Sequence, residues 1–138
     1  MATGTPALLQ EIYAAYREQR LADALAHLTD DFRFTLHLPA EALPGAGTPH
    51  GKAETAKLFE GIIATYDFLM YEPGPIMVTG DQAAVRVRIR YRHKATEAII
   101  ETTLGHFWRV RDGKAAQLDE YHDVQHVLAF LDKVASGG

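Results

Sequence analysis

The sequence predicts a single α+β domain over residues 1–138, in which helices pack on a strongly bent antiparallel sheet. Residues 83–123 contain three consecutive strand patterns, and the first of them alternates apolar residues with arginines. Helical patterns, with apolar residues three or four positions apart, lie on both sides of this stretch. Helices and strands segregated in this way are typical of α+β domains.

Two helical segments and one strand are expected before the first loop. Thr5 and Pro6 form a typical helix start, with a capping hydroxyl and a proline at the first helical position. The apolar stripe that follows is interrupted near Arg20 and resumes at Leu21. Over residues 32–38 apolar side chains alternate with polar ones, which predicts a short strand.

Residues 39–51 contain three prolines and three glycines, which predicts a long loop. Loops of this length in a compact domain are usually functional or disordered. We therefore expect this loop to border a ligand pocket and to be more mobile than the sheet.

A helix over residues 52–66 follows the loop, with its apolar residues on one side. The next strand, over residues 68–79, is interrupted by Pro73-Gly74-Pro75. Because proline cannot donate to a strand ladder, this interruption predicts an edge position or a bulge.

Three strands and a final helix complete the expected fold. Residues 85–91 alternate between apolar side chains and arginines, so one strand face is apolar and the other is cationic. An apolar-rich strand over residues 99–111 and a return strand over 114–122 are joined by Asp112-Gly113, a hairpin turn dipeptide. Asp123 is placed to cap the last helix, a role that we favour over catalysis.

Composition excludes several classes of function. A hydrophobic content of 47% and a charged content of 23% are ordinary for a globular domain of 138 residues. A net charge of −4 argues against binding to nucleic acid. The chain has no cysteine, which excludes thiolate catalysis and zinc–thiolate sites and fits a cytoplasmic location. No signal peptide or membrane span is evident, and we expect no cofactor and no bound metal.

Two neighbouring strands carry the candidate catalytic side chains. His106 shares a strand face with Trp108. On the next strand, Glu120 shares a face with Leu118 and His122. If the tryptophan and the leucine point inward, a carboxylate and imidazoles are buried together and can act as a base–acid pair. The alternative is a structural ion pair inside a dry core.

Other candidate residues have two interpretations each. Tyr16 can offer a hydrogen bond to the pocket or only fill the core, and Trp108 is a pocket wall or plain core.

His122 and His126 have the spacing of metal ligands on a helix, but the first is expected in a strand and no third ligand is evident. The arginines at positions 86, 88, 90 and 92 can bind an acidic partner, but a solvated face or ion pairs across a dimer interface are favoured.

Three segments of the sequence resemble a known family: LADALAHLTDDFRFTLH, HGKAETAKLFEGI and GHFWRVRDGKAAQLDEYHDVQHVLAFL. They resemble the SnoaL-like branch of the nuclear transport factor 2-like superfamily, which also includes ketosteroid isomerase and limonene-epoxide hydrolase. The resemblance covers nearly the whole chain and implies a cone-shaped α+β fold with a hydrophobic pocket. It also implies a homodimer joined through the outer sheet face. It implies no single reaction, because one pocket serves many reactions in this superfamily.

The resemblance suggests roles for three residues. His106 falls where the isomerases place an acid of the oxyanion hole. Glu120 falls where the epoxide hydrolases place a carboxylate that activates water. Tyr16, or with less support Tyr13, lies near the helical oxyanion tyrosine of the isomerases.

The chain departs from both of these enzyme types at decisive positions. Leu36 stands where the isomerases have their base aspartate. Val87 and Ile89 stand where the epoxide hydrolases have an arginine and an aspartate. Neither reaction therefore carries over intact.

We predict an enzyme that isomerises, cyclises or hydrates a small hydrophobic carbonyl or epoxide by general acid/base chemistry. Glu120 is expected to be the base, His106 the proton donor or oxyanion partner, and Tyr16 a supporting donor. A non-catalytic ligand-binding or dimerisation domain of the same fold is the alternative, and the sequence does not identify the substrate. The expected pocket wall contains Phe34, Leu36, Phe59, Val87, Ile89 and Trp108, together with His122.

Overall fold

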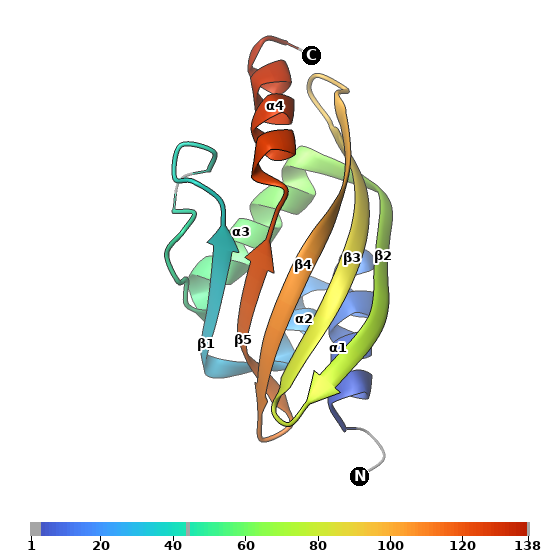
Figure 1. The fold of residues 1–138 in the computed structure, drawn as a ribbon, viewed down its shortest axis with the longest axis vertical. Helices are drawn as coiled ribbons and strands as arrows, with labels where there is room; N and C mark the ends of the chain where they lie inside the picture. Colours follow the sequence, from blue (N-terminus) through green and yellow to red (C-terminus); the bar gives the residue numbers. More distant parts are fainter. Residues whose placement is uncertain (1–3, 44, 138) are drawn as a thin grey trace.

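The computed structural model describes residues 4–43 and 45–137, which form an α+β domain of four helices and five strands (Figure 1). The predicted order of elements and the α+β fold class are confirmed. In chain order the elements are α1 (Gly4–Arg17), α2 (Leu21–Ala26), β1 (Leu28–His37), α3 (Lys52–Thr65), β2 (Tyr66–Thr79), β3 (Gln82–His93), β4 (Ile99–Arg111), β5 (Lys114–Tyr121) and α4 (Val124–Ala135).

The strands form one sheet in the order β1-β5-β4-β3-β2. Strands β2 to β5 form the predicted antiparallel meander, but β1 pairs with β5 in parallel. The sheet is therefore mixed and not antiparallel throughout. The cause is topological, because the chain leaving β1 crosses through α3 to the opposite edge of the sheet before β2 begins.

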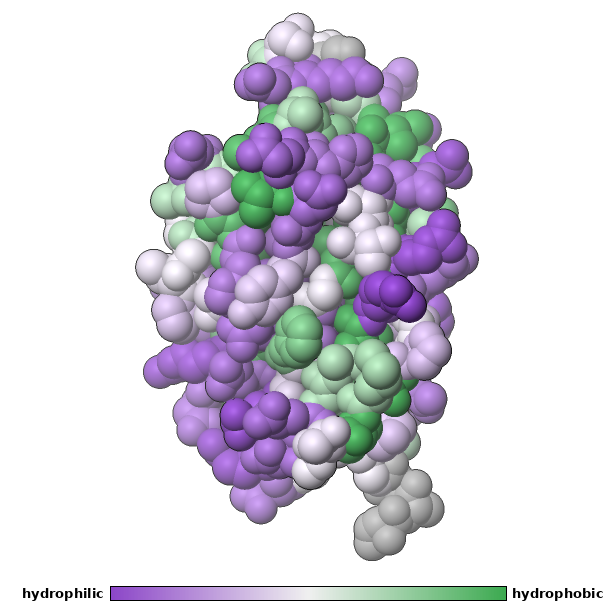
Figure 2. All heavy atoms as spheres, in the orientation of Figure 1, coloured by the Kyte–Doolittle hydropathy of each residue, from purple (hydrophilic) through white to green (hydrophobic). Residues whose placement is uncertain are grey.

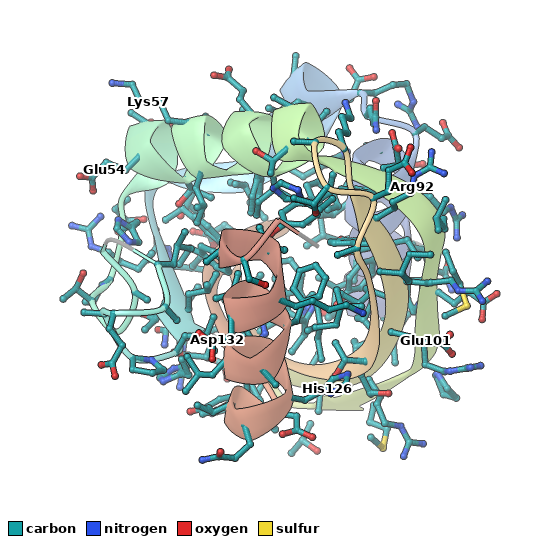
Figure 3. All side chains as sticks on the ribbon, turned by 90° about the horizontal axis from the view of Figure 1, so that it is seen from above. Glu54, Lys57, Arg92, Glu101, His126 and Asp132 are labelled. Carbon is teal, nitrogen blue, oxygen red and sulfur yellow. The ribbon has the colours of Figure 1, made fainter. Side chains whose placement is uncertain are left out.

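Helices α1, α2 and α3 lie on one face of the sheet, and α4 lies beyond the end of β5 (Figure 1). Seen from above, the sheet curves beside α3 and α4, while Glu54 and Lys57 of α3 point away from it (Figure 3). In β3, Val85, Val87 and Ile89 are buried, whereas the arginines between them are exposed. Burying each such aliphatic side chain stabilises the fold by about 1.5–3 kcal/mol, which fixes the phase of the strand.

Two helix boundaries predicted from local residues are confirmed. The break near Arg20 separates α1 from α2, and Gln19 adopts a left-handed conformation there, with a φ of 61°. Asp123 caps α4 by accepting a hydrogen bond from the backbone N–H of His126 at 3.2 Å. None of the helices formed by the described residues is long and apolar enough to cross a membrane.

The loop over residues 39–51 is bonded to β1, the strand at one edge of the sheet. His50 and Phe34 exchange two backbone hydrogen bonds of 2.8 and 2.9 Å, and the N–H of Gly47 donates to the carbonyl of Leu36. No described residue of the loop lines the internal cavity. The loop therefore does not border the pocket as predicted, because backbone hydrogen bonds hold it against the sheet edge. Its greater mobility stays a prediction.

Strand β2 forms the opposite edge of the sheet. Its register with β3 shifts between Pro73 and Ile76. Both the edge position and the irregularity predicted from Pro73-Gly74-Pro75 are therefore present.

Candidate active site

A cavity of about 170 Å³ lies between the inner face of the sheet and the helices. Its wall is mainly aliphatic and aromatic, and among the residues that the structure describes no lysine, arginine or aspartate lines it. Val87, one of the predicted wall residues, is fully buried in the core and does not reach the cavity, although it shares a strand face with Ile89. The other predicted wall residues line it: Phe34, Leu36, Phe59, Ile89, Trp108 and His122.

The register of β4 and β5 places polar side chains in this apolar cavity. His106 lies directly opposite Glu120, and Trp108 lies opposite Leu118. Trp108 and Leu118 are 5% and 3% exposed, which identifies this face as the inner one. His122 follows the end of β5 and also lines the cavity. The strand pairing thus brings together the carboxylate and the two imidazoles that share faces in the sequence pattern.

Two hydrogen bonds connect Glu120 to helix α1 through His106, and a third joins Trp108 to the same helix. His106 Nε2 lies 2.8 Å from Glu120 Oε1, and His106 Nδ1 lies 2.6 Å from the hydroxyl oxygen of Tyr13. The indole N–H of Trp108 donates to the same hydroxyl at 2.9 Å. The rings of Tyr13 and His106 are also stacked, with their centroids 5.6 Å apart.

The directions of these bonds follow from the donors present. Trp108 Nε1 can only donate, so the Tyr13 oxygen accepts from it and gives its single proton to His106 Nδ1. His106 then carries its own proton on Nε2 and donates it to the carboxylate. A doubly protonated His106 would leave the Tyr13 proton without an acceptor among the described residues. The hydrogen-bond pattern thus assigns a neutral His106 with both nitrogens occupied.

Glu120 is ionised at neutral pH despite its burial. Its side chain is 15% exposed, and this burial by itself raises the pKa of the carboxyl. The hydrogen bond from His106, the neighbouring ring of His122 and the positive charge that the His122 ring can carry act in the opposite direction and outweigh burial. The pKa of Glu120 therefore lies well below its usual range.

His122 stands beside the other oxygen of the same carboxylate. Its Nε2 lies 2.9 Å from Glu120 Oε2, which is an ion-pair distance. The ring nitrogen is nevertheless not aligned for a hydrogen bond with that oxygen, and it has no hydrogen-bond partner among the described residues. The two oxygens of Glu120 therefore differ, since one accepts a hydrogen bond from His106 and the other lies beside His122, which also lines the cavity.

Tyr13 and Tyr16 both line the cavity from α1, but only Tyr13 bonds His106. Burial raises the pKa of both phenols, and the charge of Glu120 adds to the rise, so both remain protonated. Tyr16 packs against Phe59, with ring centroids 5.0 Å apart. The resemblance to the isomerases favoured Tyr16. Helical spacing could not rank the two tyrosines, because residues three positions apart lie on the same helix face.

The two histidines considered as metal ligands point to different places. His122 lines the cavity, whereas His126 Nε2 lies 3.0 Å from the carbonyl oxygen of Glu101. In Figure 3, His126 is on the side of α4 that faces the sheet near Glu101. Among the described residues, no group of three histidine, aspartate or glutamate side chains could hold a metal ion.

The arginine stripe lies on the outer face of the sheet, which Figure 2 shows as largely hydrophilic. Arg88 and Arg90 lie 3.6 and 3.4 Å from the carboxylate of Glu101, and Arg92 bonds Asp67 at 2.8 Å. These side chains are about half exposed, so each pair contributes only about 0–1 kcal/mol to stability. The stripe therefore makes local ion pairs on the outer face, and none of its arginines lines the cavity.

Comparisons with known proteins agree on the fold. The sequence profile of the SnoaL-like domain matches residues 9–118. A candidate isomerase from Rhodopseudomonas palustris is 18% identical over 90% of this chain and 92% of its own, with a TM-score of 0.77. No protein with a curated description matches the chain significantly.

Two further solved structures are similar to this chain. IdmH, a candidate polyketide cyclase from Streptomyces antibioticus, is 24% identical over 91% of this chain and 96% of its own, with a TM-score of 0.74. A protein of ketosteroid-isomerase-like fold from Catenulispora acidiphila, solved in complex with trimethylamine, is 15% identical over 91% of this chain and 92% of its own, with a TM-score of 0.75. At these identities the likeness shows a common fold and leaves the chemistry open.

Proposed function

The chain belongs to the SnoaL-like domain family, and we propose that it is an enzyme that isomerises, cyclises or hydrates a small hydrophobic molecule by general acid/base chemistry. Glu120 is the base in this proposal. His106 and Tyr13 hold the base in place, and Tyr16 forms part of the aromatic wall and offers a second hydroxyl.

An ionised carboxylate inside an apolar cavity carries the proposal. A buried carboxylate costs free energy unless it is paired, and such groups are frequent at functional sites. Only one oxygen of Glu120 accepts an aligned hydrogen bond, from His106, and the other lies 2.9 Å from His122 Nε2 without an aligned bond. The low pKa keeps the base deprotonated but limits its strength, so the reacting proton must be an acidic one.

The wall of the cavity favours a neutral substrate. Its polar groups are phenols, imidazoles, one indole, one threonine and one carboxylate, and the other lining side chains are apolar. An anionic substrate would meet the charge of Glu120 without any lysine or arginine among the described wall residues. A small hydrophobic ketone, aldehyde or epoxide fits these constraints, and a carbonyl makes the protons on its neighbouring carbon the most acidic that such a ketone or aldehyde offers to a weak base.

Deuterium exchange tests the proposal without knowledge of the natural substrate. Acetophenone in heavy water exchanges its methyl protons slowly, and proton NMR follows the rate. We expect the protein to accelerate this exchange, and Glu120→Gln to reduce the acceleration about 10²-fold or more. Asp119→Asn is the matched control, because Asp119 lies on the outer face beside Glu120 in the chain, and it should exchange at the wild-type rate.

The same experiment decides against the alternative, a non-catalytic ligand-binding domain. Such a domain would bind acetophenone without accelerating exchange. Equal acceleration by wild type and Glu120→Gln would also remove Glu120 as the base. In both cases a thermal melt of each variant shows whether the fold is intact.

We further propose a homodimer joined through the outer sheet face. Phe107 and Tyr121 on that face are 52% and 44% exposed, and their rings meet edge to face at 5.6 Å. Figure 2 shows hydrophobic residues gathered over the lower part of this face. Sedimentation equilibrium at high micromolar concentration should give the mass of two chains, and Phe107→Glu should give one. A wild-type monomer would contradict the proposal. A cytoplasmic location also stays a prediction.

A further inference from the structure

One buried side-chain nitrogen in the cavity has no hydrogen-bond partner among the described residues, and it is His122 Nε2. Its side chain is 11% exposed and lines the cavity. Glu120 Oε2 lies 2.9 Å away but out of line with the ring N–H. Because buried polar groups in native proteins are normally paired, this nitrogen indicates a place where a ligand atom completes the bonding.

His106 cannot serve in that way. Its Nδ1 accepts the proton of Tyr13 and its Nε2 donates to Glu120, so neither nitrogen is left for a ligand. It is also only 2% exposed. Of the two imidazoles beside the carboxylate, His122 alone has a ring nitrogen available inside the cavity.

We infer that His122 is the proton donor of the site, with its Nε2 directed at the carbonyl oxygen of a neutral ligand while Glu120 Oε2 takes the proton from the adjacent carbon. This inference rests on the proposed function and names the second catalytic residue of that reaction. The short distance between the two atoms suits neighbouring positions of one small substrate, because a carbonyl oxygen and its α-hydrogen lie close together.

The step balances with the groups present. The α C–H bond breaks and its proton passes to the Glu120 carboxylate, while the electron pair forms a carbon–carbon double bond. The carbonyl oxygen receives a proton from the imidazolium of His122. The products are an enol, a neutral imidazole and a carboxylic acid, so the site begins and ends without net charge. When a second double bond adjoins the enol, Glu120 returns its proton to the far carbon of this dienol while the enol hydroxyl gives its proton back to His122, which re-forms the carbonyl and completes an isomerisation.

A pair of ligands of equal shape tests this role by binding alone. Acetophenone and α-methylstyrene differ only in a carbonyl oxygen that replaces a methylene group. We expect the wild type to bind acetophenone at least about tenfold more tightly by titration calorimetry, and to lower the infrared carbonyl stretch of the bound ketone. His122→Leu should lose both effects, and His122→Gln, which keeps a donor, should retain part of them.

His126→Leu is the matched control, because it makes the same change four residues away at a side chain that does not line the cavity. It should keep the wild-type preference and carbonyl shift. The inference is overturned if the wild type shows no preference, or if His122→Leu keeps the preference and the carbonyl shift.

Nitrogen-15 NMR of the wild-type histidine rings gives a second readout that needs no variant. Addition of acetophenone should shift the His122 Nε2 resonance and leave His126 unchanged, and an unmoved His122 resonance at saturating ketone counts against the inference.

Deuterium exchange separates the two proposals. Normal carbonyl preference without accelerated exchange removes the enzyme but keeps the donor, whereas accelerated exchange that survives in His122→Leu keeps the enzyme and removes the donor.

Discussion

Two neighbouring residues of β5 make two histidine–carboxylate pairs, one on each face of the sheet. On the inner face, His106 Nε2 lies 2.8 Å from Glu120, and on the outer face His37 Nε2 lies 2.9 Å from Asp119. The inner imidazole and carboxylate side chains are 3% and 15% exposed, whereas the outer ones are 34% and 24% exposed. The chemistry and the distances are nearly the same, and only the surroundings differ.

The surroundings determine how much each pair matters. His106 is bonded at both nitrogens, and its other partner, Tyr13, is itself buried and bonded to Trp108. Loss of any one of these hydrogen-bonded side chains therefore leaves a buried neighbour without its partner. His37 lies on the ring of Tyr121 with centroids 4.1 Å apart, and water can replace its contact with Asp119. A short distance alone does not distinguish a site from a surface pair.

The largest expected difference is in stability after removal of each imidazole. His106→Leu leaves the Glu120 carboxylate without its donor and should lower the free energy of unfolding by about 3–5 kcal/mol. His37→Leu, on the exposed pair, should lower it by at most about 1 kcal/mol. Urea unfolding followed by tryptophan fluorescence measures both. Equal losses would mean that burial does not separate the two pairs.

Removal of one hydroxyl from α1 should have the next largest effect. Tyr13→Phe leaves the Trp108 N–H and His106 Nδ1 unpaired and should cost about 1–3 kcal/mol. Tyr16→Phe should cost less, since Tyr16 is held mainly by aromatic packing. The same urea titrations compare them, and a larger loss for Tyr16→Phe would restore Tyr16 as the principal hydroxyl of the site.

Acid should reduce the difference in stability between the wild type and Glu120→Gln. The pKa of Glu120 is lowered by folding, so its ionised form stabilises the fold above the ordinary carboxyl pKa of about 4.3. That contribution declines as pH falls from there towards the lower pKa of the folded state, by up to about 1.4 kcal/mol per pH unit. Unfolding curves between pH 5 and pH 2.5 give the free energy of unfolding against pH for the wild type and for Glu120→Gln. Equal slopes for the two proteins would show that Glu120 has an ordinary pKa.

The smallest effect is expected at the arginine stripe. Glu101→Gln removes contacts of 3.6 and 3.4 Å to Arg88 and Arg90, all of them with half-exposed side chains. The loss should be within about 1 kcal/mol and should disappear at 1 M salt, where exposed charges are screened. A loss that persists at high salt would show that this outer face is buried in an assembly.

The fold was predictable because burial repeats along the strands. Alternation in β3 identified the inner face, and the prolines of β2 identified an irregular edge. The parallel partner of β5 was not predictable in this way, because strand direction depends on where the chain crosses the sheet and not on side-chain period. The attachment of the loop over residues 39–51 to β1 was also not predicted, because backbone hydrogen bonds do not depend on which side chains the loop contains.

The site was predictable only where the alternation of residues along a strand (the strand phase) shows which face of the sheet a side chain lies on. Phase placed His106 and Glu120 on inner faces, and the structure shows them directly opposite each other. Phase did not separate Tyr13 from Tyr16, because both lie on the same side of α1. It also placed Val87 with Ile89, although only the second reaches the cavity. Which inward residues meet an open space depends on packing in three dimensions.

The two edges of the sheet limit how copies of this protein can aggregate. An edge strand with free N–H and C=O groups can add a strand from another molecule, which is a common route to aggregation. Here the loop bonds to part of β1, and β2 contains two prolines and a shift in register. Both edges are therefore poor templates for strand addition, and self-association is directed to the faces of the sheet, where contacts are made by side chains and can be removed by single substitutions.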